Sequence, residues 1–366
     1  MAVGGVHAEK EREWTNLEGR SFRGQWVGED GAERLRIRHE DGRMFTVERS
    51  QLSDGDAVYV AERLERGERR GSGEGMRPIP GGIFQMGDAQ GQLNVAMPVH
   101  PVVVDAFYLG EHLVTYAEWR AVVEWATAPE RGAARYRFDH EGRSGGGRGA
   151  GARMPVTCIN WYDALKWCNA RSEKEGREPV YYEDRDHREV YRTGRRDLLP
   201  EQVRWAANGY RLPTEAEWER AARGGREGEP FVWGSEDPHP GRANYWNSAP
   251  ENGTTEVGLF PANPYGLFDL AGNVWEWTWT RWGSFDGRAW RNPMGVAHAS
   301  HRVTRGGSWS NPAHDLQVAY RRVTHPTNSY PRIGLRVAQS AENWGNEGWN
   351  EPFGEEKEQG KRVDGR

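Results

Sequence analysis

The chain has 366 residues, 36 % of them hydrophobic, and a mean hydropathy of −0.90, so it is polar and long enough for about two domains. Its net charge is −5 and no block of Lys and Arg stands out, so we expect no nucleic-acid partner. No apolar run approaches the roughly 20 residues of a membrane span. The 18 Trp and 47 Gly residues predict a loop-rich domain in which aromatic rings pack irregular backbone.

The segment from residue 9 to residue 64 predicts a small β-barrel. Arg36–His39 and Met44–Glu48 alternate in polarity as half-buried strands do, and the Asp41-Gly42 pair between them predicts a hairpin turn. The ending Leu52–Tyr59 resembles the close of the SH3-like SLA-homology domain. That resemblance implies either peptide binding or a spacer that docks onto another part.

Three segments have compositions that predict loops or linkers. The charged, Gly-rich residues 65–77 predict a flexible linker, and residues 142–152 predict a loop insertion within the large domain. The Gly-, Glu- and Lys-rich residues 341–366 predict a disordered tail. The large domain is therefore expected at residues 78–340.

The N-terminus leaves two interpretations of localisation open. Val6-His7-Ala8 places small residues where a signal peptidase reads them, just before a charged stretch. An upstream signal peptide would make the protein exported, to the periplasm or beyond. An ordinary ragged start would make it cytoplasmic.

The large domain begins with predicted strands and two helices. Strand pieces flank the Gly-Gly turn within Ile79–Gly87, and Val102–Tyr108 alternates as another strand does. Thr115 and Glu118 form a capping-box pattern that predicts a helix start. A second helix is predicted over Asn160–Asn169, with Cys168 on its apolar stripe.

A third predicted helix leads into the most specific motifs of the chain. Thr214 is the expected N-cap, Glu217 completes a capping box, and Gly224 is placed to end the helix. This segment and five later ones follow one another in the order of a known family: Gly209–Gly225, Phe231–Gly234, Ala243–Tyr245, Tyr265–Thr278, Arg305–Trp309 and Ile333–Arg336. The chain thus resembles the formylglycine-generating enzyme (sulfatase-modifying factor) family. The resemblance implies an irregular α+β fold, related to C-type lectins.

The same resemblance implies a structural calcium site. By position, Asp269 and Glu276 would supply carboxylate oxygens, and Gly272 and Val274 would supply carbonyl oxygens, which are ligands that calcium prefers. The alternative is a capped turn in which Glu276 forms a salt bridge. A second family site would use Asn244 and the carbonyl of Tyr245, but its later ligands fall in a shortened stretch, residues 252–256.

The cysteine content argues against the family's oxidase chemistry. That chemistry uses two thiolates to hold copper(I), because soft sulfur ligands select this ion. The chain has only Cys158 and Cys168, either as a disulfide or as two buried thiols, and Asn311 stands where the first family cysteine would be. Since no cysteine follows Cys168, we expect no copper and assign no catalytic residue.

The leading hypothesis is therefore a calcium-stabilised binding module for a peptide, a glycan or a partner protein. Its expected groove residues are Ser308, Trp309, Asn311, Arg321 and Arg332. One alternative is an oxygen-dependent oxidoreductase with an altered metal centre, for which His298, His301, His314 and His325 are the available imidazoles. Two others are a purely structural module of a cell-surface assembly and a Ser308–His314–Asp315 catalytic arrangement.

Overall fold

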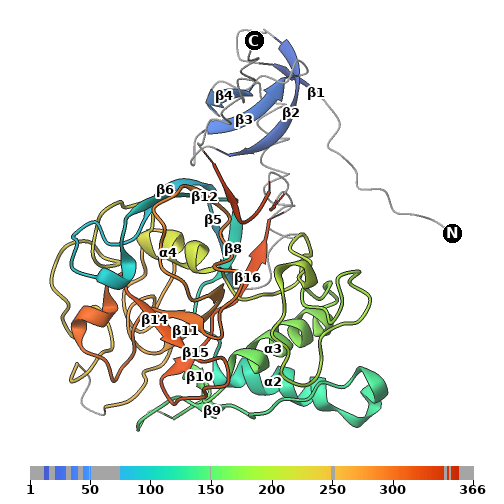
Figure 1. The fold of residues 1–366 in the computed structure, drawn as a ribbon, viewed down its shortest axis with the longest axis vertical. Helices are drawn as coiled ribbons and strands as arrows, with labels where there is room; N and C mark the ends of the chain where they lie inside the picture. The colour runs from blue at the N-terminus through green and yellow to red at the C-terminus, as the bar shows by residue number, and fades with distance from the viewer. Residues whose placement is uncertain are drawn as a thin grey trace, which may run out of the picture. The chain divides into compact units, whose positions relative to one another are not determined.

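The computed structural model describes residues 12–15, 21–29, 34–39, 44–48, 50, 75–148, 150–248, 252–341, 344–345 and 348–353. The chain divides into two compact units, Met1–Ser72 and Gly73–Arg366 (Figure 1). The first unit contains one antiparallel sheet in the order β1-β2-β3-β4, formed by Arg12–Thr15, Ser21–Glu29, Arg34–His39 and Met44–Glu48. β3 and β4 pair with Arg38 opposite Met44, which agrees with the predicted hairpin. The Leu52–Tyr59 ending lies outside the described residues, so the SH3-like barrel stays a prediction.

The second unit is a mixed α and β structure built from several small sheets (Figure 1). A four-stranded sheet has the order β14-β13-β11-β15, formed by Arg321–Thr324, Arg302–Arg305, Trp275–Arg281 and Ile333–Gly334. A second has the order β17-β12-β7-β6, formed by Glu351–Pro352, Trp290–Arg291, His100–Val104 and Gly82–Met86. Smaller sheets join β16 (Ala338–Ser340), β8 (Phe107–Gly110) and β5 (Met76–Ile79), and β10 (Val156–Thr157) with β9 (Arg143–Ser144).

The α-helices among the described residues begin where the sequence predicts. They are α2 (Tyr116–Thr127), α3 (Trp161–Lys174) and α4 (Glu215–Arg223), and short 3-10 helices lie at Asn94–Ala96, Pro129–Ala134, Pro200–Gln202 and Ala313–Leu316. Thr115 and Thr214 each form a complete capping box, and Asn160 caps α3. Gly224 ends α4 at φ 58°, in the left-handed region where glycine carries no Cβ penalty. No described helix is long and apolar enough to cross a membrane.

The strand predicted over Val102–Tyr108 is two strands in two sheets. β7 ends at Val104 and β8 begins at Phe107. Between them, the backbone N–H of Asp105 donates to Asn292 Oδ1 at 2.9 Å in place of a ladder partner. A Cβ on Gly81 would lie 2.6 Å from the nitrogen of Ala106, so this crossing requires glycine.

Tryptophan rings fill the core as the composition predicts. The indoles of Trp119, Trp167, Trp218 and Trp277 are fully buried, and Trp119 stacks on Trp167 at 5.6 Å. Cys158 and Cys168 are both free thiols, so the disulfide alternative does not hold. Burial raises the pKa of Cys168 well above its ordinary value, which leaves this thiol unreactive.

Candidate functional site

A chain of hydrogen bonds follows β13 and organises the face that the sequence analysis singled out. Ser308 Oγ donates to Asn311 Oδ1 at 2.5 Å, and the indole of Trp275 donates to the same oxygen at 2.9 Å. Asn311 Nδ2 in turn donates to Asp315 Oδ2 at 2.6 Å. Asn311 is thus the centre of a polar network, fixed by bonds on both ends of its amide.

The network ends at an exposed imidazole and does not form a nucleophilic triad. His314 Nε2 lies 2.8 Å from Asp315 Oδ1, and the His314 side chain is 62 % exposed. The Asn311 amide stands between Ser308 and Asp315, so the Ser308 hydroxyl faces an amide oxygen and not a base. A general base must reach the hydroxyl proton directly or through one water, and this order of contacts does not provide it.

Two arginines border this network without an ion pair. The guanidinium of Arg322 lies 5.5 Å from the Trp275 ring, and that of Arg332 lies 4.9 Å from the Tyr330 ring. Neither forms a salt bridge in the part of the chain that the structure describes, and the buried Nε of Arg332 has no hydrogen-bond partner. Burial, and next the charge of Arg332, lower the pKa of Arg322.

Among the described residues, the carboxylate beside these arginines is that of Asp315, and it already has other partners. Asp315 attracts Arg322 through space, but its two oxygens are bonded to Asn311 and His314. Burial, followed by the charge of Asp315, raises the pKa of Tyr320, whose ring lies 6.0 Å from His314. The face therefore combines aromatic rings with positive charge that its own residues leave unneutralised.

The structure separates Arg321 from the other four predicted groove residues. Arg321 is 3 % exposed, and its guanidinium donates to both oxygens of Glu215 at 2.6 and 2.7 Å. It also covers the Phe285 ring at 3.9 Å, so it belongs to the core. Ser308 is buried within the network, while Trp309, Asn311 and Arg332 are half-buried.

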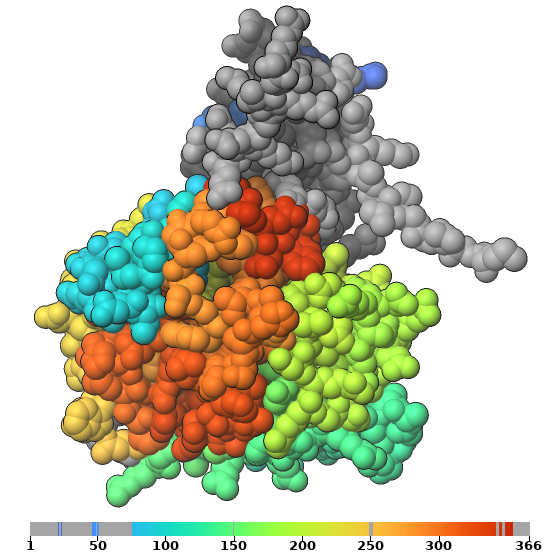
Figure 2. All heavy atoms as spheres, viewed as in Figure 1, coloured from blue at the N-terminus to red at the C-terminus, as the bar shows by residue number. Residues whose placement is uncertain are grey.

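The Gly-rich loop predicted as an insertion packs beside this face. A Cβ on Gly146 would lie 1.8 Å from the carbonyl oxygen of Pro331 and 2.9 Å from the Trp309 indole nitrogen. The Gly146 N–H donates to Thr254 Oγ1 at 3.0 Å. Figure 2 shows green atoms from the middle of the chain along the lower edge of the orange-red C-terminal segments. Glycine is thus required here for close approach.

The two carboxylates of the predicted calcium loop differ in how many of their oxygens have partners. Both oxygens of Glu276 bond to the Arg336 guanidinium, at 3.0 and 3.1 Å, and the Trp218 indole adds a bond of 2.9 Å. Asp269 Oδ2 accepts from the Gly258 N–H at 2.7 Å, but its buried Oδ1 has no partner. Burial raises the pKa of Asp269 to about 6. Asp269 therefore has one oxygen without a protein partner, whereas both oxygens of Glu276 form the salt bridge.

The two residues of the second predicted calcium site also differ in their hydrogen-bond partners. Asn244 Nδ2 donates to the Gly253 carbonyl at 2.9 Å, while its buried Oδ1 has no partner. The Tyr245 carbonyl already accepts from the N–H and the hydroxyl of Ser248. Gly272 lies against Asn244, because a Cβ on it would be 2.1 Å from the Asn244 carbonyl oxygen. Val274 is fully buried beside this turn.

The C-terminal histidines do not assemble into a metal centre in the described structure. The rings of His301 and His325 lie 5.2 Å apart, but their Nδ1 atoms bond to Ser300 and Thr327. No group of three or more His, Cys, Asp or Glu side chains gathers for a metal anywhere among the described residues. His298 lies apart from these, in the wall of a cavity that we describe below.

A family model described as the sulfatase-modifying factor enzyme 1-like domain matches residues 61–341. The chain belongs to this family. The chain is 29 % identical to "Chaperone protein LppX" of Paenibacillus barcinonensis, over 65 % of this chain and 82 % of that one. It is 32 % identical to the bovine (Bos taurus) formylglycine-generating enzyme, over 72 % of this chain and 74 % of that one.

A solved structure resembles the sulfatase-modifying factor-like domain of this chain. The structure titled "Treponema denticola variable protein 1" matches with a TM-score of 0.58 and 28 % identity, over 72 % of this chain and 94 % of that one. The mixed α and β fold predicted from the motifs is therefore that of the family, and the likeness to C-type lectins stays a prediction.

Sequence reasoning missed four contributors to the face of this sulfatase-modifying factor-like domain: Trp275, Tyr320, Arg322 and Tyr330. The sequence did offer Arg322 as the alternative to Arg321. Neighbouring residues of a strand point to opposite faces, so only one of the two arginines can lie in the groove. Choosing between the two arginines required knowing that Glu215 lies across from β14. That contact joins residues 106 positions apart, which no local pattern reveals.

Proposed function

We propose that this sulfatase-modifying factor-like protein is a binding module that captures an acidic segment of a peptide or partner protein. The site is the face formed by Ser308–Asn311, Tyr320, Arg322 and Arg332, above the fully buried ring of Trp275. The observation that carries the proposal is the pair Arg322 and Arg332, two half-buried guanidiniums without an ion pair in the described structure. A ligand carboxylate would supply the missing partner, with the short, charge-assisted bonds that arginine forms.

The aromatic rings at this face support a protein ligand. Tyr320 and Tyr330 lie beside the two arginines, the Trp309 indole is half-buried at the edge, and the fully buried Trp275 ring lies beneath Arg322. Tyr, Trp and Arg are the side chains that dominate binding energy at protein interfaces. The Trp275 indole beneath them is fixed by Asn311, which gives the face a rigid support. Pre-organisation of this kind reduces the entropy lost on association.

The same residues argue against copper-dependent oxidation. The network places Asn311 at the position where the resemblance puts a cysteine, and both ends of its amide are occupied by Ser308, Trp275 and Asp315. Hard amide and carboxylate oxygens are poor ligands for copper(I). The altered-metal oxidoreductase gains no support from the separated histidines. Binding without oxidation therefore accounts for the face better.

Calcium would have a structural role in this proposal. Asp269 Oδ1 and Asn244 Oδ1 are buried oxygens without partners, on segments that contact each other through the Asn273 N–H and the Asn244 carbonyl. Hard oxygens of this kind are calcium ligands, and the carbonyls of Gly272 and Val274 would complete the predicted set. Glu276 would not take part, because Arg336 holds both of its oxygens.

Selection from a random peptide library on the purified protein tests the binding proposal. We expect enrichment of Asp- and Glu-containing peptides, and loss of that enrichment in the Arg322→Gln/Arg332→Gln variant. The variant Arg242→Gln, which removes a half-buried arginine that is paired with Glu236, should select the same peptides as the unmodified protein. Enrichment of neutral or basic peptides, selective binding to a glycan array instead, or stoichiometric copper or iron in the purified protein would each overturn the proposal.

A further inference from the structure

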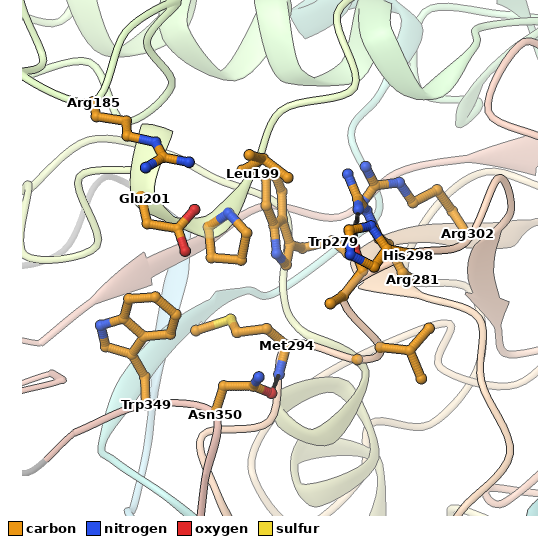
Figure 3. A pocket seen from close by; sticks show the side chains of 14 residues that line it. Arg185, Leu199, Glu201, Trp279, Arg281, Met294, His298, Arg302, Trp349 and Asn350 are labelled. Atoms are coloured by element: carbon orange, nitrogen blue, oxygen red, sulfur yellow. Dashed lines mark hydrogen bonds between the residues drawn. The ribbon is translucent and has the colours of Figure 1, made fainter.

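A cavity lies apart from the proposed binding face. It is enclosed by the end of β11, the loop at residues 294–298, the start of β13, the turn at Leu199–Glu201, and Trp349–Asn350 (Figure 3). Its volume is about 250 Å³, near the lower end of the range for small-molecule sites. None of the residues of the binding face lines it, so it needs an explanation of its own.

One side of this cavity is a rigid apolar wall. Trp279 and Met294 are 1 % and 2 % exposed, and Leu199 and Trp349 add further apolar surface to the lining (Figure 3). The Trp279 ring is held in place by Trp161, Trp205 and Tyr181, at centroid distances of 5.5, 5.5 and 5.7 Å. A wall fixed from behind in this way is formed before any ligand arrives, and it suits a flat apolar group.

The other end of the cavity is positively charged. Figure 3 shows the guanidiniums of Arg281 and Arg302 grouped with the His298 ring, whereas Arg185 and Glu201 lie together at the far side. Arg281 and Arg302 are both buried and share one carboxylate, that of Asp197, which Arg281 contacts at 2.9 Å. Two guanidiniums facing one carboxylate leave a net positive charge beside the apolar wall.

Burying this excess positive charge is energetically unfavourable, and a bound anion would neutralise it. Burial lowers the pKa of Arg302 to about 10; Asp197 opposes this effect and Arg281 adds to it. The two side chains are held in position regardless, because Arg302 lies 3.7 Å from the Trp161 ring centroid and donates to the Trp279 carbonyl. Arg281 donates to the carbonyls of Ala297 and Leu198. The cationic end is therefore as preformed as the apolar wall.

We propose that this cavity binds a carboxylate attached to an apolar or aromatic group. The carboxylate would contact the Arg281–Arg302 end, and the apolar group would lie against Trp279 and Met294. Such a ligand could be a free aromatic acid or the C-terminal residue of a peptide, because both present the same carboxylate. Attraction between the carboxylate and this cationic end orients the ligand, while burial of the ring supplies most of the affinity.

Calorimetric titration of the full chain with matched probes tests this site. The probes are 3-phenylpropionate, its neutral amide, and an N-acetylated peptide ending in Gly-Gly-Phe with a free or amidated C-terminus. We expect each carboxylate to bind at least about tenfold more tightly than its amide, a difference of about 1.4 kcal/mol. Tighter binding of the peptide acid than of phenylpropionate would identify a chain terminus as the source, and the reverse would identify a free acid.

Two variants distinguish this cavity from other surfaces. Arg281→Gln should weaken carboxylate binding about tenfold or more. Val296→Trp, a change at an exposed lining position, should block both acids while leaving the fold intact. Arg242→Gln should bind as the unmodified protein does. Equal binding of acids and amides, acid binding that survives Val296→Trp, or no saturable acid binding up to about 10 mM would each overturn the proposal.

Discussion

Two consecutive arginines on β14 have opposite environments. Arg321 is buried, pairs with both oxygens of Glu215, and covers an aromatic ring of the core. Arg322 is half-buried on the other side of the strand, with no carboxylate partner in the described structure. The core follows the same rule at Arg305, Arg211 and Arg336, each of which faces a glutamate.

This comparison identifies which charges serve the fold and which remain for a ligand. Leaving a buried charge unpaired costs several kcal/mol, so folding selects sequences that pair it. At a partly exposed face, water reduces that cost, and an unpaired guanidinium can be retained for binding. Arg322 and Arg332 meet this description, and the three predictions below test it, from the largest expected effect to the smallest.

The neighbouring substitutions Arg321→Met and Arg322→Met should separate stability from binding. Arg321→Met leaves Glu215 buried without its cation and should lower the free energy of unfolding by about 3 to 5 kcal/mol. Arg322→Met should change it by less than about 0.5 kcal/mol, as surface substitutions do. Denaturant unfolding of the two variants measures both values. Similar losses in the two variants would mean that Arg322 is also a structural arginine.

Glu219→Gln should weaken the paired cluster and change its pH dependence. Burial opposes ionisation of Glu219, but Arg223 and Arg305 outweigh burial, so its pKa lies below the ordinary value of 4.5. A lowered carboxyl pKa contributes stability above about pH 4.5 that is lost as the pH falls through the folded-state value. The variant should be less stable by about 3 kcal/mol at pH 7, with a shallower decline on acidification.

The control for this change is Glu236→Gln, at an exposed pair with Arg242, which should shift the free energy of unfolding by less than about 0.5 kcal/mol. Thermal unfolding between pH 3 and pH 7 provides both curves. If Glu219→Gln kept the full acid-side slope, another carboxylate would account for it.

Asp269→Asn applies the same test to a negative charge, because Asp269 is a buried carboxylate with one oxygen that lacks a partner. Because burial raises the pKa of Asp269 to about 6, its contribution favours folding below about pH 4 and is lost as the pH rises towards 6. Without calcium at pH 7, Asn should therefore stabilise the protein by about 1 to 3 kcal/mol, and it tolerates the φ of 56° at this position.

Calcium should make the unmodified protein more stable than the Asp269→Asn variant. Added calcium is expected to raise the melting temperature of the unmodified protein, because it binds only the folded state, and to leave Asp269→Asn nearly unchanged. Differential scanning calorimetry in EGTA and in calcium gives the comparison. An equal response of both proteins would remove Asp269 from the calcium proposal.

The sequence predicts local features of this fold well and long-range ones poorly. Helix starts at Thr115 and Thr214 were predictable because a capping box is complete within four residues. The break between β7 and β8 was not, since it depends on Asn292, 187 positions from Asp105. The family motifs located the candidate face. Arg321 does not lie on that face, however, because its guanidinium pairs with Glu215 in the core.

The calcium loop shows the same division. The motif located Asp269 and Glu276 in one turn, but the Arg336 contact that occupies Glu276 joins residues 60 positions apart. The close approach of Gly146 to Pro331 likewise depends on the fold, although the run of glycines predicted a loop there. Local chemistry thus identified candidates, and distant partners decided their roles.

The most direct test of the central claim is the affinity of a selected acidic peptide, measured by fluorescence anisotropy against an otherwise identical peptide with Asn and Gln in place of Asp and Glu. The account predicts that the acidic peptide binds the unmodified protein at least about tenfold more tightly, and that Arg322→Gln/Arg332→Gln abolishes this preference. An unchanged preference in the double variant would contradict the account, because the unpaired arginines would then not read the ligand's charge.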